Sequence, residues 1–249
     1  MPRPSALRLL SAVLGLAALA ACSPAPPGVD IWDPQEAQNR EAHAFNQRLD
    51  RVIAGSGTGP SLPAPLTVAA ANFANNAGGP SDTLNSVLQG RPGDAIGNAL
   101  RFMVNTTFGI GGLFDIATPL GVEGRRTDFG ETLHVWGVRE GAYQELPLLG
   151  PSTERDTAGL IVDLLFDPFN ALRPVSTRNR LILARATTRG IANLGERATY
   201  AEAIDALITA SPDSYARTRL LYLQTRRFRL DGEAALADDV FDPFDPYVD

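Results

Sequence analysis

Few side chains in this sequence could carry out covalent or metal chemistry. The chain has one cysteine, Cys22, and two histidines, His43 and His134, and all 22 of its basic residues are arginine. Without lysine, a Walker A phosphate loop, a Schiff base and a Ser-Lys dyad are excluded. Neither histidine belongs to a His-Glu-x-x-His helix or to a cluster with the spacing of metal ligands. We therefore expect no catalytic residues, no metal site and no cofactor.

His134 leaves one enzymatic alternative open. The sequence has no Gly-x-Ser-x-Gly motif, so a Ser-His-Asp hydrolase would have to be built around His134 and a serine that no motif marks. His43 lies between Ala42 and Ala44 on a predicted helix, where a surface or half-buried position is the simplest expectation.

Cys22 follows a segment with the layout of an export signal. Arg3 and Arg8 precede an apolar stretch that is shorter than the roughly 20 apolar residues that a transmembrane helix needs. The sequence Leu-Ala-Ala-Cys that ends at Cys22 resembles the lipobox of bacterial lipoproteins, where cleavage leaves a lipidated cysteine. We expect removal of residues 1–21 and a lipid anchor on Cys22; the alternative is an ordinary signal peptide with an incidental cysteine. Ser23, where aspartate would favour the inner membrane, favours sorting to the outer membrane.

The charge of the chain limits the kinds of partner that it can bind, and its length limits the number of its domains. The formal net charge is −6, which argues against nucleic acid as a partner. Once Cys22 is lipidated, no cysteine remains for a disulfide, so packing alone must hold the fold. The length that follows the signal fits one large domain or two small ones.

The sequence predicts several amphipathic helices. Asp33 is placed as the N-cap of a first helix that ends before Gly55. An apolar stripe runs from Ile96 to Val104 at helical spacing, and Asn98 and Asn105 are available for another face. Further helices are predicted to begin near Thr153, Thr199 and Ser211.

Two long segments carry almost no charge. Residues 52–81 have none, and residues 102–122 have only Asp115. Prolines and glycines interrupt both segments, so neither can cross a bilayer with its backbone hydrogen bonds satisfied. They either form a water-soluble core or lie within one leaflet of a membrane, and composition alone favours the core. Asp163, inside a predicted helix that is otherwise apolar, must find a partner or line a wet cavity.

Basic and acidic residues are separated in the C-terminal part of the chain. The segment 211–230 is rich in arginine and includes Arg217, Tyr222, Arg226 and Arg227. Arginines near a helix C-terminus suit the helix dipole; the alternative is a surface for an acidic protein or for phospholipid headgroups. Residues 231–249 are acidic and contain two prolines, and we expect them to be disordered.

Short motifs in a fixed order give the chain a resemblance to a known family. They are Asp33-Pro34, Asn39-Arg40, Phe45-Asn46, Asn72-Phe73, Leu88-Gln89-Gly90, Asn105-Thr106-Thr107, Gly109–Gly112, Asp128–Leu133, Trp136-Gly137, Leu146–Ser152, Arg155-Asp156, Asp213-Ser214-Tyr215 and Tyr222-Leu223-Gln224. In this order they resemble the VacJ/MlaA family of phospholipid-transport lipoproteins. The segment Gly55–Pro65 departs from the family pattern, because a shorter, glycine-rich link replaces a proline, an alanine and a tyrosine there.

The resemblance implies a mainly α fold, a ring-like bundle of amphipathic helices around a central lipid channel, leaflet-embedded and with little or no sheet. It implies a lipidated linker at 22–32, a helical lipid-transport domain at 33–230 and the acidic tail at 231–249. For the two uncharged segments it reverses the preference for a soluble core. The expected location is the inner leaflet of the bacterial outer membrane, facing the periplasm.

The resemblance also implies a function. Such a protein removes mislocalised phospholipids from the outer leaflet and passes them to a periplasmic lipid-carrier protein (MlaC-like), which maintains outer-membrane lipid asymmetry. It works beside an outer-membrane porin trimer and breaks no bond, so no enzymatic activity is expected. Two alternatives remain, a scaffold lipoprotein that binds porins without moving lipid and a lipid hydrolase that uses His134.

Candidate residues follow from the need of a lipid for an apolar route and for polar groups near its head. The candidates for the lipid path are Phe45, Asn46, Phe102, Asn105, Thr106, Phe108 and Asp163. The candidates for contact with the carrier or with headgroups are Arg217, Tyr222, Arg226 and Arg227. For Phe45, an ordinary core position is an equal expectation.

Overall fold

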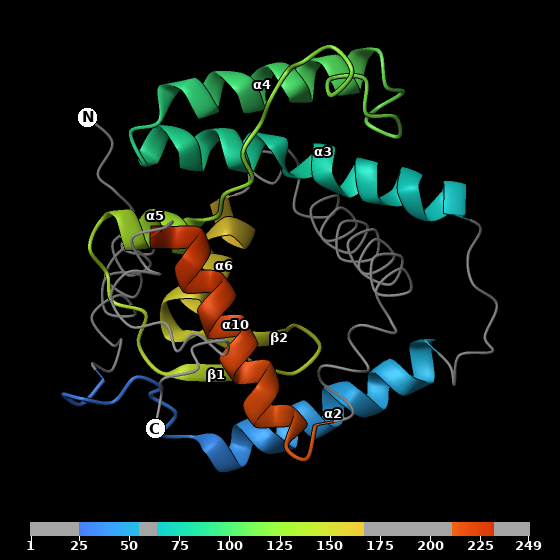
Figure 1. Cartoon of the computed structure of the whole chain (residues 1–249). Coiled ribbons are helices and arrows are strands. Elements are labelled where there is room, and N and C mark those ends of the chain that lie inside the picture. Colours follow the sequence, from blue (N-terminus) through green and yellow to red (C-terminus); the bar gives the residue numbers. More distant parts are fainter. Residues whose placement is uncertain (1–24, 55–63, 167–210, 232–249) are drawn as a thin grey trace, which may run out of the picture.

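The computed structural model describes residues 25–54, 64–166 and 211–231 (Figure 1). Several features predicted from the sequence lie outside these residues. They are the signal peptide 1–21, the anchor Cys22, most of the glycine-rich link (residues 55–63), the helix start at Thr199 and the acidic tail from 232 to 249.

Helix α2, Glu36–Ala54, is the first helix that the sequence predicts, but it begins later than expected. Asp33 precedes it and is not its N-cap. The Asp33 carboxylate accepts a hydrogen bond from Asn39 Nδ2 at 2.8 Å, and it also accepts hydrogen bonds from Tyr215 and Arg219. The N-cap prediction is therefore wrong, because Asp33 forms a buried ion pair with Arg219 instead.

Helices α3, Ala64–Leu88, and α4, Pro92–Thr107, form a hairpin in which they lie side by side (Figure 1). Gly90 in the turn has a φ of +71°, a conformation that glycine adopts without strain. Where the two helices meet, Gly79 faces Phe102. A Cβ atom on Gly79 would lie 3.1 Å from the Cβ of Phe102, so a side chain at this position would fit only if Phe102 shifted by a few tenths of an ångström.

Helices α5, Phe129–Val135, and α6, Glu154–Phe166, are separated in sequence by a small sheet. Its strands, β1 Tyr143–Leu146 and β2 Gly150–Thr153, pair antiparallel with Tyr143 opposite Thr153. Asp128 caps α5 by accepting a 2.8 Å hydrogen bond from Glu131 N–H. Thr153 accepts a 3.2 Å bond from Asp156 N–H, which confirms the helix start predicted there.

Helix α10, Ser214–Asp231, begins slightly after the predicted start at Ser211. The carboxylate of Asp213 accepts a 3.0 Å hydrogen bond from Ala216 N–H and thus satisfies a donor of the first turn. The helix contributes Tyr215 and Leu223 to a small core, in which both are buried together with Tyr143 of β1. This core attaches α10 to the two-stranded sheet.

The described elements are arranged as a ring. Figure 1 shows the α3–α4 hairpin along one side and α2 along the opposite side, with α5, α6, the strands and α10 between them at one end. The predicted mainly helical, ring-like fold with little sheet is confirmed. A lipid channel and a position within one leaflet stay predictions. None of the helices in the described ranges combines the length and the apolarity that a membrane crossing requires.

Candidate functional site

The α3–α4 hairpin is amphipathic with its polar side inward. On α4, Asn98 and Asn105 are buried, whereas Ile96, Leu100 and Met103 are exposed, Ile96 by 62%. In water this orientation is unfavourable, because burying a large apolar side chain is worth about 1.5–3 kcal/mol. The apolar stripe predicted on α4 therefore exists, but it faces away from the protein.

Helix α3 repeats this orientation. Asn76 and Asn85 are buried, whereas Leu66, Val68 and Val87 are each more than half exposed. Asn76 Nδ2 donates to Thr106 Oγ1 of α4 at 2.9 Å, so the polar sides of the two helices are joined by a hydrogen bond. Amides between the helices and alkyl groups on the outside are the reverse of a soluble helical hairpin.

The segment after α4 extends the apolar surface. Phe108, Ile110, Phe114 and Leu120 are all more than half exposed, and Phe108 is exposed by 70%. The single charge in this segment, Asp115, is held toward α4. Its carboxylate accepts hydrogen bonds from Asn105 Nδ2 at 3.1 Å, from Arg101 Nη2 at 2.9 Å and from the Thr118 hydroxyl at 2.6 Å.

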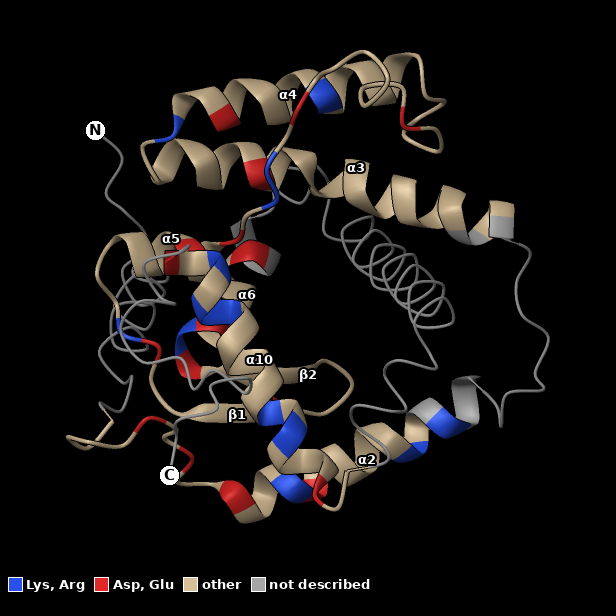
Figure 2. Cartoon of the chain, viewed as in Figure 1, with Lys and Arg blue, Asp and Glu red and all other residues tan. Residues whose placement is uncertain are grey.

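The distribution of charge agrees with that of the apolar side chains. Figure 2 shows charged residues concentrated on α2, α5, α6 and α10, whereas the first part of α3 has none. We call α3, α4 and residues 108–122 together the apolar hairpin. Contiguous exposed apolar surface marks sites of contact with a membrane, a ligand or another protein. The apolar hairpin can therefore exclude water only if such a neighbour covers it.

Asp163 on α6 does find the partners that the sequence requires. Its carboxylate accepts hydrogen bonds from Phe129 N–H at 2.9 Å, from Asn85 Nδ2 at 3.0 Å and from the Ser81 hydroxyl at 3.2 Å. Burial raises the pKa of Asp163 above its ordinary value, although these donors oppose the shift. Asp163 thus joins α6 to α3 and to the start of α5.

A second polar cluster joins α10 to α5 and α6. Arg226 is buried and donates to both oxygens of Asp128, at 2.7 and 2.9 Å, and to both oxygens of Asp156, at 2.9 and 3.0 Å. The Tyr222 hydroxyl donates to Asp156 at 2.8 Å. Burial alone would raise the pKa of Asp156, but the hydrogen bonds and charge of Arg226 hold it below its ordinary value.

A third cluster attaches α2 to β1 through Glu145, which is buried. His43 Nδ1 lies 3.4 Å and Asn46 Nδ2 3.3 Å from the same oxygen of Glu145, and the Tyr143 hydroxyl donates to the other oxygen at 2.5 Å. On its other side His43 Nε2 lies 3.3 Å from the Ser214 hydroxyl. His43 is therefore buried within a polar network, and the prediction of a surface or half-buried position is wrong.

The structure does not gather the predicted lipid-path residues into one site. Phe45 and Phe108 are exposed, but they lie on α2 and beyond α4, on opposite sides of the ring. Asn46 also accepts a 2.7 Å hydrogen bond from Leu148 N–H, so it positions the turn of the sheet. Asn105 accepts bonds from Ile116 and Ala117 N–H and thus holds the segment after α4. Phe102, Thr106 and Asp163 contact other elements, as described above.

The predicted basic surface on α10 is mostly neutralised within the fold. Arg226 and Tyr222 belong to the Asp128–Asp156 cluster, and Arg227 donates to Glu140 at 2.5 Å. Arg217 is exposed, and no ion pair joins it to any other described residue. Of the four candidates, Arg217 is the one whose charge is most available to a partner.

His134 lies between two charged side chains. Its Nδ1 is 3.3 Å from Arg155 Nη1, and its Nε2 is 2.9 Å from a carboxylate oxygen of Asp231. Neither ring nitrogen bonds a serine within the described ranges. No group of three or more metal-ligating side chains occurs in those ranges either.

Sequence reasoning missed Glu131, which is 1% exposed. It accepts hydrogen bonds from Arg91 at 2.5 Å and from Arg125 at 2.6 Å, and it thereby joins the turn of the apolar hairpin to α5. Asp128 and Glu131 have the spacing of a capping box, and this pattern was the available signal for α5. Nothing local in the sequence indicates that the two arginines reach Glu131.

Comparisons with known proteins agree with the geometry. The family model described as MlaA lipoprotein matches residues 31–229. An intermembrane phospholipid transport system lipoprotein MlaA of Escherichia coli is 32% identical over 237 residues, which cover 91% of this chain and 90% of that protein. An uncharacterized protein of Rickettsia typhi is 35% identical over 153 residues, and this match spans 56% of the chain but only 57% of that relative.

A solved structure also resembles the chain. It is described as the structural basis for maintenance of bacterial outer membrane lipid asymmetry. The two chains have a TM-score of 0.63 and 29% sequence identity, and the match covers 78% of this chain and 96% of that one.

Proposed function

Because this chain belongs to the MlaA lipoprotein family, we propose that it is an outer-membrane lipoprotein that removes mislocalised phospholipids from the outer leaflet. It passes them to a periplasmic lipid-carrier protein and so maintains the lipid asymmetry of the outer membrane. The E. coli relative is named as part of an intermembrane phospholipid transport system, and the similar solved structure concerns outer-membrane lipid asymmetry.

The observation that carries this proposal is the apolar hairpin with its polar side inward. Asn76, Asn98 and Asn105 are buried between its parts, whereas Ile96 and Met103 face outward. Hydrocarbon is the neighbour that this surface fits, because it makes the outward alkyl groups favourable, while the Nδ2 groups of Asn76, Asn98 and Asn105 donate to protein oxygens between the parts of the hairpin. The hairpin then lies in the inner leaflet without crossing the membrane, as an interfacial helix does.

The lipid anchor and the apolar hairpin have separate roles in this proposal. Acyl chains on Cys22 bring the protein to the membrane, since each buried methylene contributes about 0.8 kcal/mol. The hairpin fixes its depth and orientation. With α3 and α4 in the leaflet, the charged elements α2, α5 and α10 face the headgroups and the periplasm (Figure 2). Residues 22–32 connect the anchor to the helical domain at 33–230.

A transported phospholipid needs an apolar surface on its way through the ring. Phe45 on α2 is 45% exposed, and Phe108 is exposed within the apolar hairpin, directly after α4. We propose these two side chains as contacts of the lipid tails, and the exposed Arg217 as a contact of the acidic or phosphate-bearing partner on the periplasmic side. Asn46, Asn105 and Asp163 then shape the path by holding the elements that surround it. An outer-membrane porin trimer is the proposed neighbour within the membrane.

The test compares outer-leaflet phospholipid in cells with and without the gene. Deletion should raise the amount of outer-leaflet phospholipid, the intact gene should restore it, and the protein purified in detergent should retain phospholipid. Unchanged outer-leaflet phospholipid in the deletion strain, together with protein free of lipid, would contradict the proposal. Rescue by a variant that binds the porin but whose lipid path is blocked would instead favour the scaffold alternative.

A further inference from the structure

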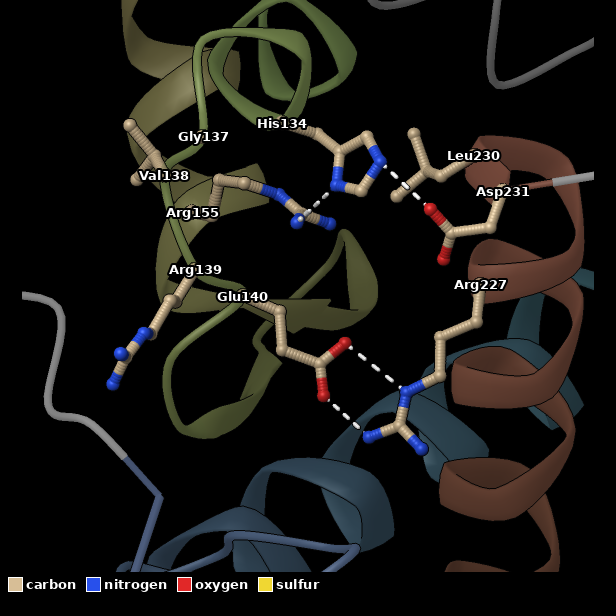
Figure 3. Close-up of a pocket in the computed structure, with 9 residues that line it drawn as sticks. All are labelled: His134, Gly137, Val138, Arg139, Glu140, Arg155, Arg227, Leu230 and Asp231. Atoms are coloured by element: carbon tan, nitrogen blue, oxygen red, sulfur yellow. Dashed lines mark hydrogen bonds and ion pairs between the residues drawn. The ribbon is translucent and has the colours of Figure 1, made fainter. Parts of the chain in front are cut away.

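An open pocket of about 370 Å³ lies on the charged part of the ring, where α5, α6 and the last turn of α10 meet (Figure 3). Three of its residues are arginines, Arg139, Arg155 and Arg227, and two are acids, Glu140 and Asp231. His134 completes its set of titratable groups. We call it the arginine pocket.

Arg155 is the residue that distinguishes this pocket from an ordinary surface ion-pair cluster. It is 3% exposed, and its Nη2 is buried with no hydrogen-bond partner among the residues that the structure describes. Its Nε is 3.4 Å from Asp156, a long contact to a carboxylate that Arg226 already holds at 2.9 Å. Figure 3 shows the Arg155 guanidinium extending beside His134 toward α10. A buried charged donor without a partner is costly, so a ligand that supplies an acceptor is favoured.

The helix dipole does not stabilise the positive charge of Arg155. It lies in the first turn of α6, where the partial charge of the helix is positive and disfavours a cation. Among the residues that line the pocket, the three arginines outnumber the two acids. Arg227 and Glu140 neutralise each other through hydrogen bonds of 2.5 and 3.2 Å, which leaves Asp231 as the one remaining acid among the lining residues. Outside the lining, Asp156 lies 3.4 Å from Arg155 Nε, but it also bonds Arg226.

Asp231 already places an anionic group at this position. Its carboxylate lies 2.9 Å from His134 Nε2 and comes from the last residue of α10. The Asp231 side chain is 41% exposed, so it can leave the pocket at little cost. An external anion would occupy the space that the Asp231 carboxylate partly fills. Unlike that carboxylate, the anion would also contact Arg155.

We infer that the arginine pocket binds a phosphate group, with Arg155 Nη2 and His134 at its inner wall and Arg139 at its rim. A tetrahedral phosphate supplies several acceptors to donors that lie in different directions. The source is either a phospholipid headgroup or free phosphate. Trp136 directly precedes Gly137 of the pocket, and it is 53% exposed. It favours the phospholipid headgroup as the source, because exposed tryptophan is typical of the membrane–water interface. Only this choice of source rests on the proposed function.

The binding experiment uses the full lipoprotein, purified in a phosphate-free detergent and depleted of lipid. Isothermal titration calorimetry at pH 7.4 measures the binding of inorganic phosphate and of glycerophosphoethanolamine in separate titrations. Tighter binding of glycerophosphoethanolamine identifies a headgroup site, and tighter binding of inorganic phosphate identifies a free-phosphate site. Either result supports the inference, and no heat of binding for both probes overturns it. Because both probes are soluble, this result is independent of whether the protein moves lipid in cells.

Three substitutions and one control test the assignment of residues. Arg139→Gln, which changes an exposed residue, should weaken binding of the preferred probe about threefold, and Arg155→Met should weaken it at least tenfold. Asp231→Asn should strengthen binding severalfold, because it removes the competing carboxylate. Arg48 is an exposed arginine on α2, and Arg48→Gln should leave the affinity for the preferred probe unchanged. If Arg155→Met does not fold, Asp231→Asn and Arg139→Gln decide the question: unchanged affinity in both overturns the inference.

Discussion

Arg226 on α10 and Asp128, the N-cap of α5, are joined by two hydrogen bonds of 2.7 and 2.9 Å although 98 residues separate them in the chain. The same guanidinium also bonds Asp156 in the first turn of α6. One arginine thus connects three helices, and two of them approach closely. A Cβ atom on Gly159 of α6 would lie 2.3 Å from the backbone nitrogen of Gly130 on α5.

Loss of Arg226 should therefore destabilise the fold strongly. Arg226→Met leaves Asp128 and Asp156 without their shared cation, and breaking a buried ion pair in this way costs about 3–5 kcal/mol. Arg217→Met, on the exposed side of the same helix, should change the free energy of unfolding by less than about 0.5 kcal/mol. Urea denaturation of both variants in detergent, followed by circular dichroism, measures the difference. Equal stability of the two variants would contradict the role of Arg226.

The pH dependence of stability should report the same cluster. The pKa of Asp156 is lowered in the folded protein, so its ionised form stabilises the fold above the ordinary value of 3.8. This contribution is lost as the pH falls from about 4 through the lowered pKa. The free energy of unfolding should decrease over this range, and the decrease should be smaller in Arg226→Met. Denaturation curves at pH 3 and pH 6 for both proteins provide the test.

The apolar hairpin should bind membranes without the lipid anchor. In a Cys22→Ser background, the double variant Ile96→Glu with Met103→Glu should bind vesicles at least tenfold more weakly than the parent, because two charges would enter the hydrocarbon region. Phe228→Glu is the matched control, since Phe228 is 48% exposed but lies on α10. Flotation with vesicles of phosphatidylethanolamine and phosphatidylglycerol measures binding. If Phe228→Glu weakens binding as much, the hairpin is not the membrane-contacting surface.

The proposed lipid path predicts contact between Phe45 and transported phospholipid. A photoreactive amino acid at position 45 should form phospholipid adducts in cells, detectable by mass spectrometry. The same amino acid at position 48, also exposed on α2, should form few. Adducts at both positions in equal amount would indicate general exposure to lipid instead of a path.

The proposed lipid anchor on Cys22 has its own test. Cys22→Ser should leave the precursor outside the outer-membrane fraction, because the proposed lipobox then lacks the cysteine that would receive the acyl chains. Membrane fractionation and mass spectrometry of the mature N-terminus measure this. Full recovery of the variant in the outer membrane would exclude the lipobox interpretation.

The helices were predictable from local patterns, whereas their orientation was not. The stripe from Ile96 to Val104 fixes the period of α4, but a helix with one apolar side satisfies the same pattern whether that side faces a core or a lipid. Composition favoured the core, and the exposed Ile96 shows the opposite orientation. The spacing of apolar residues does not depend on whether water or lipid surrounds the helix, so it cannot predict which way the apolar side faces.

The roles of the polar motif residues were also beyond local reasoning. Asn46 was a candidate for the lipid path, yet it bonds Leu146 and Leu148, about one hundred residues further along the chain. Arg226 was a candidate for a carrier surface, yet it is buried between two aspartates. Such pairings depend on the tertiary arrangement of whole elements, which no spacing within a helix specifies.

The outward orientation of the apolar hairpin has a consequence for the proposed export of the chain to the outer membrane. On this proposed route between the inner and the outer membrane, Ile96, Met103 and Phe108 would be exposed to water, where such surfaces promote self-association. We therefore expect the chain to depend on an escort that shields α3 and α4 until delivery. Light scattering after dilution out of detergent should show rapid aggregation of the parent and slower aggregation of the Ile96→Glu, Met103→Glu variant.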